Sequence, residues 1–481
     1  MSGNSTSRSN RIRRTSVRLA VWGVLFAAGF AFSAVFFKVP AYVEFTYFVK
    51  SHPIVSSIFE IRAVKSVYYY LKPKLGLGWT GAFFRAKLPS NDGLGETQQE
   101  EIEMLLALGY AGGVSPARKR SGTTFHEKDL AHQGLNLQND GHIAEAVLMD
   151  MDGNTLHRWT YPFSKAFPNS ASFDGEPGTY NWRRVVLLPD GELLALYNQH
   201  GMIKLDRDSN LLWTFDDHVH HDMEVLADGS IYVLANQAEI MERISSDRPV
   251  LHDTIVRLDA AGREIERFSM LDAIENSDFG PLLDYAPKFG DMMHTNEIEV
   301  LDGRLADWNP AFEAGNLLIS IRNFNAIVVV DPIEHKVLWA LSNLFSGQHD
   351  SQVLKNGNLL VFDNKGDVGH VSRVVEFDLR SQQMVWSYRG SEHDFHSETC
   401  GAAQRLPNGN TLITESNFGR AFEVTPDNSI VWEYYSPERT GPDDVFIAQI
   451  FEMKRIAPES VPWLNPVMAH GAEDKEPVTA Q

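Results

Sequence analysis

The sequence predicts an all-β protein, a six-bladed β-propeller preceded by an N-terminal transmembrane helix and a short, partly helical segment. Three observations predict the propeller. A strand–turn–strand unit recurs from about residue 140 onward, six of the units end at an aromatic residue, and one strand pattern is left over near the C-terminal end. Units of about 40–50 residues cannot bury both faces of their sheet alone, so they stack on neighbours as propeller blades do.

Each repeat holds an Asp-Gly or Asn-Gly turn between two apolar strands. Three copies show this clearly, namely VLLPDGELLALYN, VLKNGNLLVFDN and RLPNGNTLITES. These dipeptides favour the positive φ values of a type I′ turn, so each one marks a β-hairpin. The repeats end at Trp159, Trp213, Trp339, Trp386 and Trp432, with Phe268 at the equivalent place in the remaining copy. Six endings imply six blades.

The two ends of the repeat region are incomplete. The first unit, AEAVLMDMDGNTLHRW, is too short for four strands, and residues 445–456, VFIAQIFEMKRI, form a strand pattern with no unit of their own. Joining the two would close the ring, whereas a β-sandwich would show less similarity between its units. We therefore predict that the propeller covers residues 126–460 and is followed by a polar tail, residues 461–481.

The N-terminal region predicts a membrane anchor. Residues 19–37 are apolar and uncharged, which suits a transmembrane helix. Residues 1–18 contain arginines and no acidic residue, so they should stay in the cytoplasm and leave the propeller in the periplasm, attached to the inner membrane by a single span. A cleaved signal peptide is the alternative, although the run is longer than a usual signal core. Residues 38–125 form the linker, with a helix predicted over residues 96–110.

Composition excludes one large class of partner. The net charge of −20, from 63 acidic and 43 basic residues, argues against a nucleic acid, because phosphate backbones require a cationic face. A small anionic ligand is still compatible with this charge, since a few local cations can reverse the field at a site. The single cysteine, Cys400, cannot form an intramolecular disulfide.

Histidines recur in step with the blades. His221 and His349 each lie eight residues before the turn glycine of their repeat, and His294 lies nine residues before its own. Each begins the first strand of its blade, which is the innermost strand in a propeller. We therefore expect these imidazoles to converge at one rim of the central channel, with His220 and His396 near them.

A histidine cluster of this kind could also hold a metal ion. However, no close pair of histidine and carboxylate has helical ligand spacing. Asp222 and Asp350 directly follow their histidines, and successive residues of a strand point to opposite faces. We therefore predict no metal site and no cofactor, with a metal site as the alternative.

Several of these segments resemble a known protein family. HHDMEVLADGSIYVLANQ, MMHTNEIEVL, LLISIRNFNAIVVVD, GQHDSQVLKNGNLLVFDN and GLNLQNDGHIAEAVLMDMDGNTLHRW are similar to bacterial arylsulfotransferases that need no nucleotide donor. The likeness covers about residues 130–456. It implies an enzyme that moves a sulfuryl group from a small aryl sulfate donor to a phenolic acceptor, on a six-bladed propeller.

The resemblance also implies roles for individual residues. His349 matches the histidine that becomes transiently sulfated, His294 with Asn296 matches a pair that holds the sulfate, Arg322 matches the active-site arginine, and His221 matches the histidine proposed for proton transfer. We expect His220, His396 and Glu398 to contact substrate. The best-characterised periplasmic members carry an N-terminal β-sandwich and a disulfide, whereas this chain has a predicted anchor and one cysteine. Its oligomeric state therefore stays open.

The residue types suit this chemistry. Neutral imidazole is both a nucleophile and a leaving group, and arginine offers a planar donor fork to sulfonate oxygens. Two structural alternatives stay open, because Arg322 could form a salt bridge between blades and Asn296 could cap a turn.

Two other functions stay open as well. One is a membrane-anchored propeller without catalytic activity, which acts as a binding or scaffold protein. The other is a different propeller enzyme, such as a quinone-dependent dehydrogenase or a lyase. The dehydrogenase would require an acidic calcium cluster and tryptophan docking motifs, whereas the tryptophans here end the blades.

Overall fold

The computed structural model describes residues 114–116, 120–170, 172, 174, 178–366, 371–390, 395–440 and 446–464. The predicted anchor, residues 19–37, and the predicted helix, residues 96–110, lie outside these ranges. Within the described ranges, no helix has the length and apolar character needed to cross a membrane.

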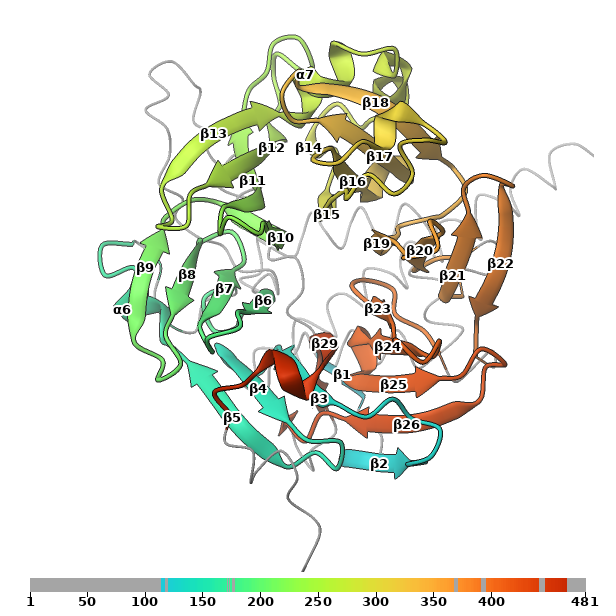
Figure 1. Cartoon of the computed structure of the whole chain (residues 1–481). Helices are drawn as coiled ribbons and strands as arrows, with labels where there is room; N and C mark the ends of the chain where they lie inside the picture. Colours follow the sequence, from blue (N-terminus) through green and yellow to red (C-terminus); the bar gives the residue numbers. More distant parts are fainter. Residues whose placement is uncertain are drawn as a thin grey trace, which may run out of the picture. The chain divides into compact units, whose positions relative to one another are not determined.

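Six antiparallel meanders of four strands surround a common axis, and the first strand of each is innermost (Figure 1). This confirms the predicted six-bladed β-propeller.

The blades are numbered here in chain order of their first strands. Blade 1 contains β6 (Arg184–Leu187), β7 (Leu193–Tyr197), β8 (Gly201–Leu205) and β9 (Leu211–Phe215); blade 2 contains β10 (Val219–Val225), β11 (Ile231–Glu239), β12 (Val250–Leu258) and β13 (Glu264–Ser269). Blade 3 contains β15 (Thr295–Val300), β16 (Leu317–Ile321), β17 (Ala326–Asp331) and β18 (Lys336–Ser342); blade 4 contains β19 (His349–Val353), β20 (Leu359–Asp363), β21 (Arg373–Asp378) and β22 (Gln383–Tyr388). Blade 5 contains β23 (Ala402–Arg405), β24 (Thr411–Glu415), β25 (Arg420–Val424) and β26 (Ile430–Tyr435); blade 6 contains β29 (Ile450–Ile456), β3 (Leu135–Asp140), β4 (Glu145–Met149) and β5 (Thr155–Thr160).

Further short elements decorate this ring. Strand β2 (Gly122–His126) extends the outer edge of blade 5, β14 (Gly290–Asp291) pairs with β12, and β1 (Val114–Pro116), β28 (Phe446–Ala448) and β27 (Arg439–Thr440) form a separate small sheet. The helical elements are α6 (Phe163–Ala166), α7 (Met270–Glu275) and the 3-10 turns η1 (Gly280–Tyr285), η2 (Pro310–Phe312), η3 (Arg322–Phe324), η4 (Ser416–Phe418) and η6 (Pro458–Ser460).

The ring closes as the sequence predicts. The C-terminal strand β29 is the innermost strand of blade 6 and pairs with β3, from the start of the repeat region, with Glu452 opposite Asn139 and Ile456 opposite Leu135. Ile450–Ile456 of the leftover segment therefore complete the short first unit, whereas Phe446–Ala448 form β28 in the separate small sheet, so the segment is two strands and not one.

The hydrophobic core lies between neighbouring blades. Six apolar clusters fill the six interfaces around the ring. Strand β11 shows how one strand supplies two of them, because Val233 packs toward blade 1 while the next residue, Leu234, packs toward blade 3. Both faces of each blade are thus covered, which explains why inner strands such as β7, LLALY, are continuously apolar.

The aromatic residue at the end of each repeat connects its blade to the next one. Trp159 of blade 6 donates from Nε1 to the carbonyl of Gly191 in blade 1, at 3.0 Å. Trp432 of blade 5 likewise donates to the carbonyl of Met151 in blade 6, at 2.8 Å. A buried indole usually finds an acceptor for its N–H, and for Trp159 and Trp432 the acceptor is a turn of the neighbouring blade.

The first strands share an irregularity at one end of the ring. In β10, β15 and β19 the pairing with the second strand shifts register close to the strand start. His221 and Asp350 lie within these register shifts and His294 directly precedes β15, with φ values of 54°, 49° and 55°. Such φ values are costly for residues other than glycine, and they often mark functional sites. A bulge also redirects the neighbouring side chains.

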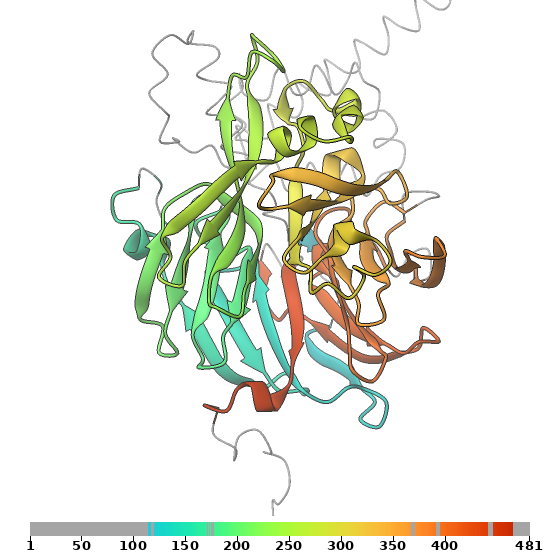
Figure 2. The same cartoon turned by 45° about the horizontal axis from the view of Figure 1, so that its top comes forward.

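One wall of the ring is taller at this same end. Strands β11 and β12 are nine residues long, and only Val219 to Val225 of β10 cover part of them, so the segment from Asn236 onward extends past the start of β10. Figure 2 shows this green hairpin rising beyond the neighbouring strands, with the short helices of residues 270–285 beside it.

Candidate active site

The in-phase histidines gather where the first strands begin. His220 and His221 lie in β10, His294 directly precedes β15, and His349 is the first residue of β19. The rings of His221 and His294 lie 4.7 Å apart between centroids, which brings blades 2 and 3 together. We call His220, His221, His294, His349, Arg322 and Arg183 the rim cluster.

His349 is held in one tautomer by its surroundings. Its Nδ1 lies 2.7 Å from Oδ1 of Asn364 and 3.1 Å from the carbonyl oxygen of Gly347. The amide of Asn364 cannot be reversed without losing bonds, because its Nδ2 donates to the carbonyls of Ser397 and Cys400. Both partners of Nδ1 are therefore acceptors, so Nδ1 carries the hydrogen and Nε2 carries the lone pair.

The same surroundings keep His349 neutral. Its side chain is buried, and burial lowers its pKa well below the usual value for histidine. The nearby charge of Arg322 lowers this pKa further. A neutral imidazole with a lone pair on Nε2 is the form that can act as a nucleophile.

Arg322 lies in the 3-10 turn η3, between β16 and β17. Asn325 ends this turn in the left-handed region, at φ 50°, which lets the chain reverse tightly before β17. The backbone N–H of Arg322 donates to the carbonyl of His294, and Nη1 of Arg322 donates to Oδ1 of Asn323 at 2.9 Å. Within the described residues no carboxylate forms an ion pair with Arg322, so the structure shows no salt bridge from this residue to another blade.

His294 and Asn296 are fixed by polar contacts on either side. Nδ1 of His294 contacts Oδ2 of Asp291, which lies in β14, so a protonated His294 keeps an Nε2–H donor while Asp291 holds its other nitrogen. Asn296 does not cap a turn. It lies within β15 and donates from Nδ2 to the carbonyl of Gln348 at 2.8 Å, which ties blade 3 to the residue before His349.

His221 and His220 form a linked pair. Their Nδ1 atoms lie 2.8 Å apart, so one nitrogen donates to the other. Burial and the charge of His294 lower both pKa values, that of His220 to about 3. Nε2 of His220 faces Asp253 at 4.0 Å, and burial raises the pKa of Asp253 to about 7. His221, His220 and Asp253 thus form a row of buried titratable groups.

His396 and Glu398 differ from the buried histidines in their exposure. Both side chains are exposed, on the segment that leads into β23. Nδ1 of His396 lies 3.3 Å from Oγ of Ser372, which donates to the carbonyl of Asn364. His396 therefore borders the residue that orients His349. Contact of either side chain with substrate stays a prediction.

Sequence reasoning missed two residues that the repeat itself could have found. Arg183 lies eight residues before Gly191, which is the phase of His221 and His349 in their blades. Asn364 lies seven residues after the turn glycine of blade 4, and Arg322 lies seven residues after Gly315 of blade 3. The end of the second strand is thus a second position from which each blade reaches the rim.

Arg183 is buried to 6% exposure and its guanidinium carbon lies 5.4 Å from the ring centroid of Phe451. Burial is the main reason for the lowered pKa values of His221 and His349, and the charge of Arg183 contributes to both. The guanidinium is therefore close to two of the in-phase histidines.

A second polar group lies one residue further along the first strands. Arg184 forms ion pairs with Asp222 of blade 2, Glu297 of blade 3 and Glu452 of blade 6. Lys454 also pairs with Glu452, at 3.2 Å. We call these five residues the inner ion-pair cluster.

The two aspartates that follow rim residues take different roles from their neighbours. Asp222 belongs to the inner ion-pair cluster, and Asp350 accepts from the backbone N–H of Ala403 in blade 5. In the parts of the chain that the structure describes, no three histidine, cysteine or acidic side chains are arranged to hold a metal ion.

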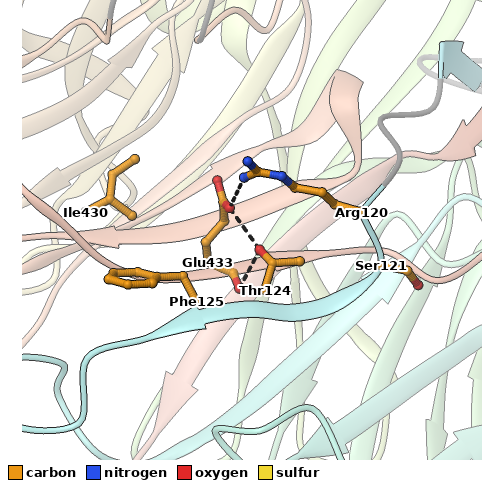
Figure 3. A pocket seen from close by; sticks show the side chains of 6 residues that line it. All are labelled: Arg120, Ser121, Thr124, Phe125, Ile430 and Glu433. Atoms are coloured by element: carbon orange, nitrogen blue, oxygen red, sulfur yellow. Dashed lines mark hydrogen bonds and ion pairs between the residues drawn. The ribbon is translucent and has the colours of Figure 1, made fainter.

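A pocket of about 700 Å³ lies elsewhere, on the outer edge of blade 5. Figure 3 shows the residues that line it, namely Arg120, Ser121, Thr124, Phe125, Ile430 and Glu433. Its charged groups satisfy one another, since Glu433 accepts from Arg120 and from Thr124, each at 2.8 Å. The pocket contains no member of the rim cluster.

The fold and the rim cluster together define a β-propeller with a histidine- and arginine-rich site at the inner strand starts. Residues 184–437, just over half of the chain, match the family model described as arylsulfotransferase (ASST). The chain therefore belongs to the arylsulfotransferase family. A search of curated proteins found no match.

Solved structures with a similar arrangement are distant. A protein of unknown function from Bacteroides caccae aligns over 66% of this chain and 99% of its own, at 14% identity and a TM-score of 0.43. A streptogramin B lyase aligns over 71% of this chain and 95% of its own, at 13% identity and a TM-score of 0.39. A catalytically inactive virginiamycin B lyase from Staphylococcus aureus, solved with quinupristin, aligns over 69% and 99%, at 10% identity and a TM-score of 0.38. These likenesses carry no functional argument.

Proposed function

We propose that the protein is an aryl-sulfate sulfotransferase that moves a sulfuryl group from a phenolic sulfate ester to a phenolic acceptor without a nucleotide donor. The proposal adds a mechanism, a ping-pong sequence through a sulfohistidine at His349. The observation that carries it is the fixed tautomer of His349, because Asn364 holds the N–H on Nδ1 and leaves the lone pair on Nε2.

In the first half-reaction, Nε2 of His349 attacks the sulfur of the donor. The N–S bond forms as the S–O bond to the phenol breaks, and the phenolate leaves with the bonding electron pair. Covalent catalysis of this kind replaces one difficult displacement by two easier ones. His221 supplies the proton that the departing oxygen takes up.

The second half-reaction reverses these roles. His221 takes the proton of the acceptor phenol, whose oxygen attacks sulfur, and the N–S bond breaks so that the electron pair returns to Nε2. Its low pKa suits the neutral form that His221 has between the two half-reactions, after it has given its proton to the departing phenolate and before it takes the proton of the acceptor.

The cations around His349 suit a sulfuryl group. Arg322 offers several N–H donors and has no carboxylate partner within the described residues, and His294 adds a donor when protonated against Asp291. Donors that are already in place cost no reorganisation when charge develops on the sulfonate oxygens, and removing one such donor typically costs about 10²–10³ in rate.

Mass spectrometry of the intact protein tests the proposal. Full-length protein given 4-nitrophenyl sulfate without acceptor should gain about 80 daltons, the mass of one SO₃ group, as a covalent intermediate requires. Peptide mapping should place the group on His349, and added phenol should remove it. His349→Asn should show neither the adduct nor release of nitrophenol.

His335→Asn is the matched control. His335 lies on an outer turn of blade 3 at φ 51°, a conformation that asparagine adopts readily, so this variant should keep full activity. An adduct on His221 or His294 would reject the nucleophile, and turnover without any adduct would favour a direct displacement. Failure to release nitrophenol with any acceptor would favour the scaffold function.

The location of the enzyme is also part of the proposal. The apolar residues 19–37 and the arginines before them support a single inner-membrane span with the propeller in the periplasm. A phosphatase reporter that works only outside the cytoplasm, fused after residue 60, should be active. Activity of a cytoplasmic reporter at the same position would reverse this topology.

A further inference from the structure

Arg183 occupies the rim position of blade 1. It lies eight residues before the turn glycine of that blade, as His349 does in blade 4. In a ring of six, blades 1 and 4 are separated by two blades on either side, so they face each other across the axis (Figure 1). The two residues at the shared rim position therefore approach the axis from opposite sides.

Contacts with the rest of the protein leave part of the Arg183 guanidinium without a hydrogen-bond partner. It is 6% exposed, it packs against the ring of Phe451, and its Nε has no hydrogen-bond partner among the described residues. Its neighbour Arg184 is the opposite case, since Nε, Nη1 and Nη2 of Arg184 all meet carboxylates. A buried arginine with an unsatisfied N–H is costly unless a ligand completes its contacts.

The in-line geometry of the transfer suggests a role for a cation at the position of Arg183. In group transfers of this type, the attacking and departing atoms lie roughly in line on opposite sides of the central atom. His349 attacks from blade 4, so the departing phenol oxygen points toward blade 1. Positive charge on that side stabilises a phenolate as it forms, whereas charge on the flanks, such as that of Arg322, acts on the sulfonate oxygens.

We infer that Arg183 binds the phenolate oxygen of the departing or attacking phenol and is a catalytic residue of the sulfuryl transfer, a role distinct from that of Arg322. This inference rests on the proposed function. Arg183 stabilises the phenolate through charge, while His221 supplies or removes the proton. The site would thus divide its cations between the two ends of the bond that breaks.

This role predicts a dependence on the leaving group. Phenyl sulfate releases a phenolate that is a strong base, so it gains much from a facing cation, whereas nitrophenolate is a far weaker base and gains little. Arg183→Gln should lower kcat/KM for phenyl sulfate by about 10²–10³-fold, the usual cost of one preorganised donor. With 4-nitrophenyl sulfate the same variant should lose less than about tenfold.

Two variants make the comparison specific. Arg183→Lys restores the charge, so it should recover part of the kcat/KM that Arg183→Gln loses with phenyl sulfate. With 4-nitrophenyl sulfate, kcat/KM should change less between these two variants. Arg263→Gln, on a side chain that is 80% exposed, should leave both donors unaffected. All variants are assayed as full-length protein, and the sulfated intermediate is followed by mass.

Equal losses with the two donors would overturn the inference, because they would mean that Arg183 holds the sulfonate or only supports the fold. Lack of rescue by lysine together with a lowered Tm would identify the structural role. If the wild-type protein transfers no sulfuryl group from either donor, the proposed function itself fails, and this outcome is visible before any variant is compared.

Discussion

Two neighbouring groups of charged residues on the same first strands differ in almost every respect. The inner ion-pair cluster is closed, because Arg184 meets carboxylates from blades 2, 3 and 6. The rim cluster lies beside it, at the starts of these strands and in the turn η3, and its arginines Arg183 and Arg322 form no ion pair with a carboxylate in the described residues. Strained φ values also fall at the rim, at His221 and His294.

The difference shows how one strand can serve stability and chemistry at adjacent positions. A buried charge that is fully paired holds blades together and has no contact left to offer a ligand. A buried charge or imidazole with an unfilled contact raises the energy of the empty site, and a ligand can recover that energy. The one-residue offset between Arg183 and Arg184 separates the two uses.

The largest expected effect comes from opening the closed cluster. Arg184→Gln leaves the buried carboxylates of Asp222 and Glu297 without their cation and Glu452 with Lys454 alone, and loss of one partner of a buried pair typically costs about 3–5 kcal/mol. Burial alone would lower the pKa of Arg184, but these carboxylates outweigh it and raise that pKa well above its usual range. Thermal or urea unfolding should show the loss.

Arg243→Gln provides the contrast for this experiment. Arg243 pairs with Asp272 and Glu275 at the surface, with 46% of its side chain exposed, so its loss should cost less than about 1 kcal/mol. Similar losses in the two variants would mean that the inner ion-pair cluster contributes no more than a surface pair.

A smaller effect is expected from a substitution in the rim cluster that keeps the positive charge. Arg322→Lys keeps the charge but replaces the planar donor fork by a single ammonium, which cannot make two parallel contacts to sulfonate oxygens. Activity should fall by about 10²–10³-fold. The Tm should stay within a few degrees of the wild type, since Arg322 supports no ion pair in the described residues. Full activity in this variant would assign Arg322 to the structure.

The smallest effect is a change in how stability responds to pH. Burial raises the pKa of Glu299 to about 8, from an unfolded value near 4.5. The folded state therefore keeps a proton that the unfolded state has lost, so this group makes stability fall as pH rises from about 4.5 to about 8. One such group contributes at most about 1.4 kcal/mol per pH unit.

Glu299→Gln cannot titrate, so its Tm should fall less steeply than that of the wild type between pH 5 and pH 8. The decline should not vanish, because burial also raises the pKa of Glu224 to about 7. Glu334→Gln, at an exposed position, should follow the wild type. Parallel curves for Glu299→Gln and the wild type would contradict a raised pKa in the folded protein.

The fold could be predicted almost completely because its signals are periodic. The turn dipeptides, the aromatic blade endings and the leftover strand over residues 445–456 each report a local rule that every blade repeats. The structure adds that the aromatic side chains connect successive blades, as Trp159 and Trp432 do. Because every blade repeats these rules, such a fold can be predicted without knowledge of any single contact.

The site could be predicted only in part. The phase of His221, His294 and His349 indicated a shared rim, but the left-handed φ values of His221 and His294 have no sequence signal, because histidine is not a residue that requires them. The orientation of His349 depends on Asn364 and on carbonyl groups from another segment of the chain. Such contacts come from tertiary structure and not from spacing.

Ring closure has a consequence for how damage at one seam would spread. Strand β29 supplies Glu452, the partner that ties Arg184 of blade 1 to blade 6. It also supplies Phe451, against which Arg183 packs. Detachment of this one strand would therefore open the ring and remove the packing partner of Arg183 in the same step, so the seam that closes the propeller also supports the rim cluster.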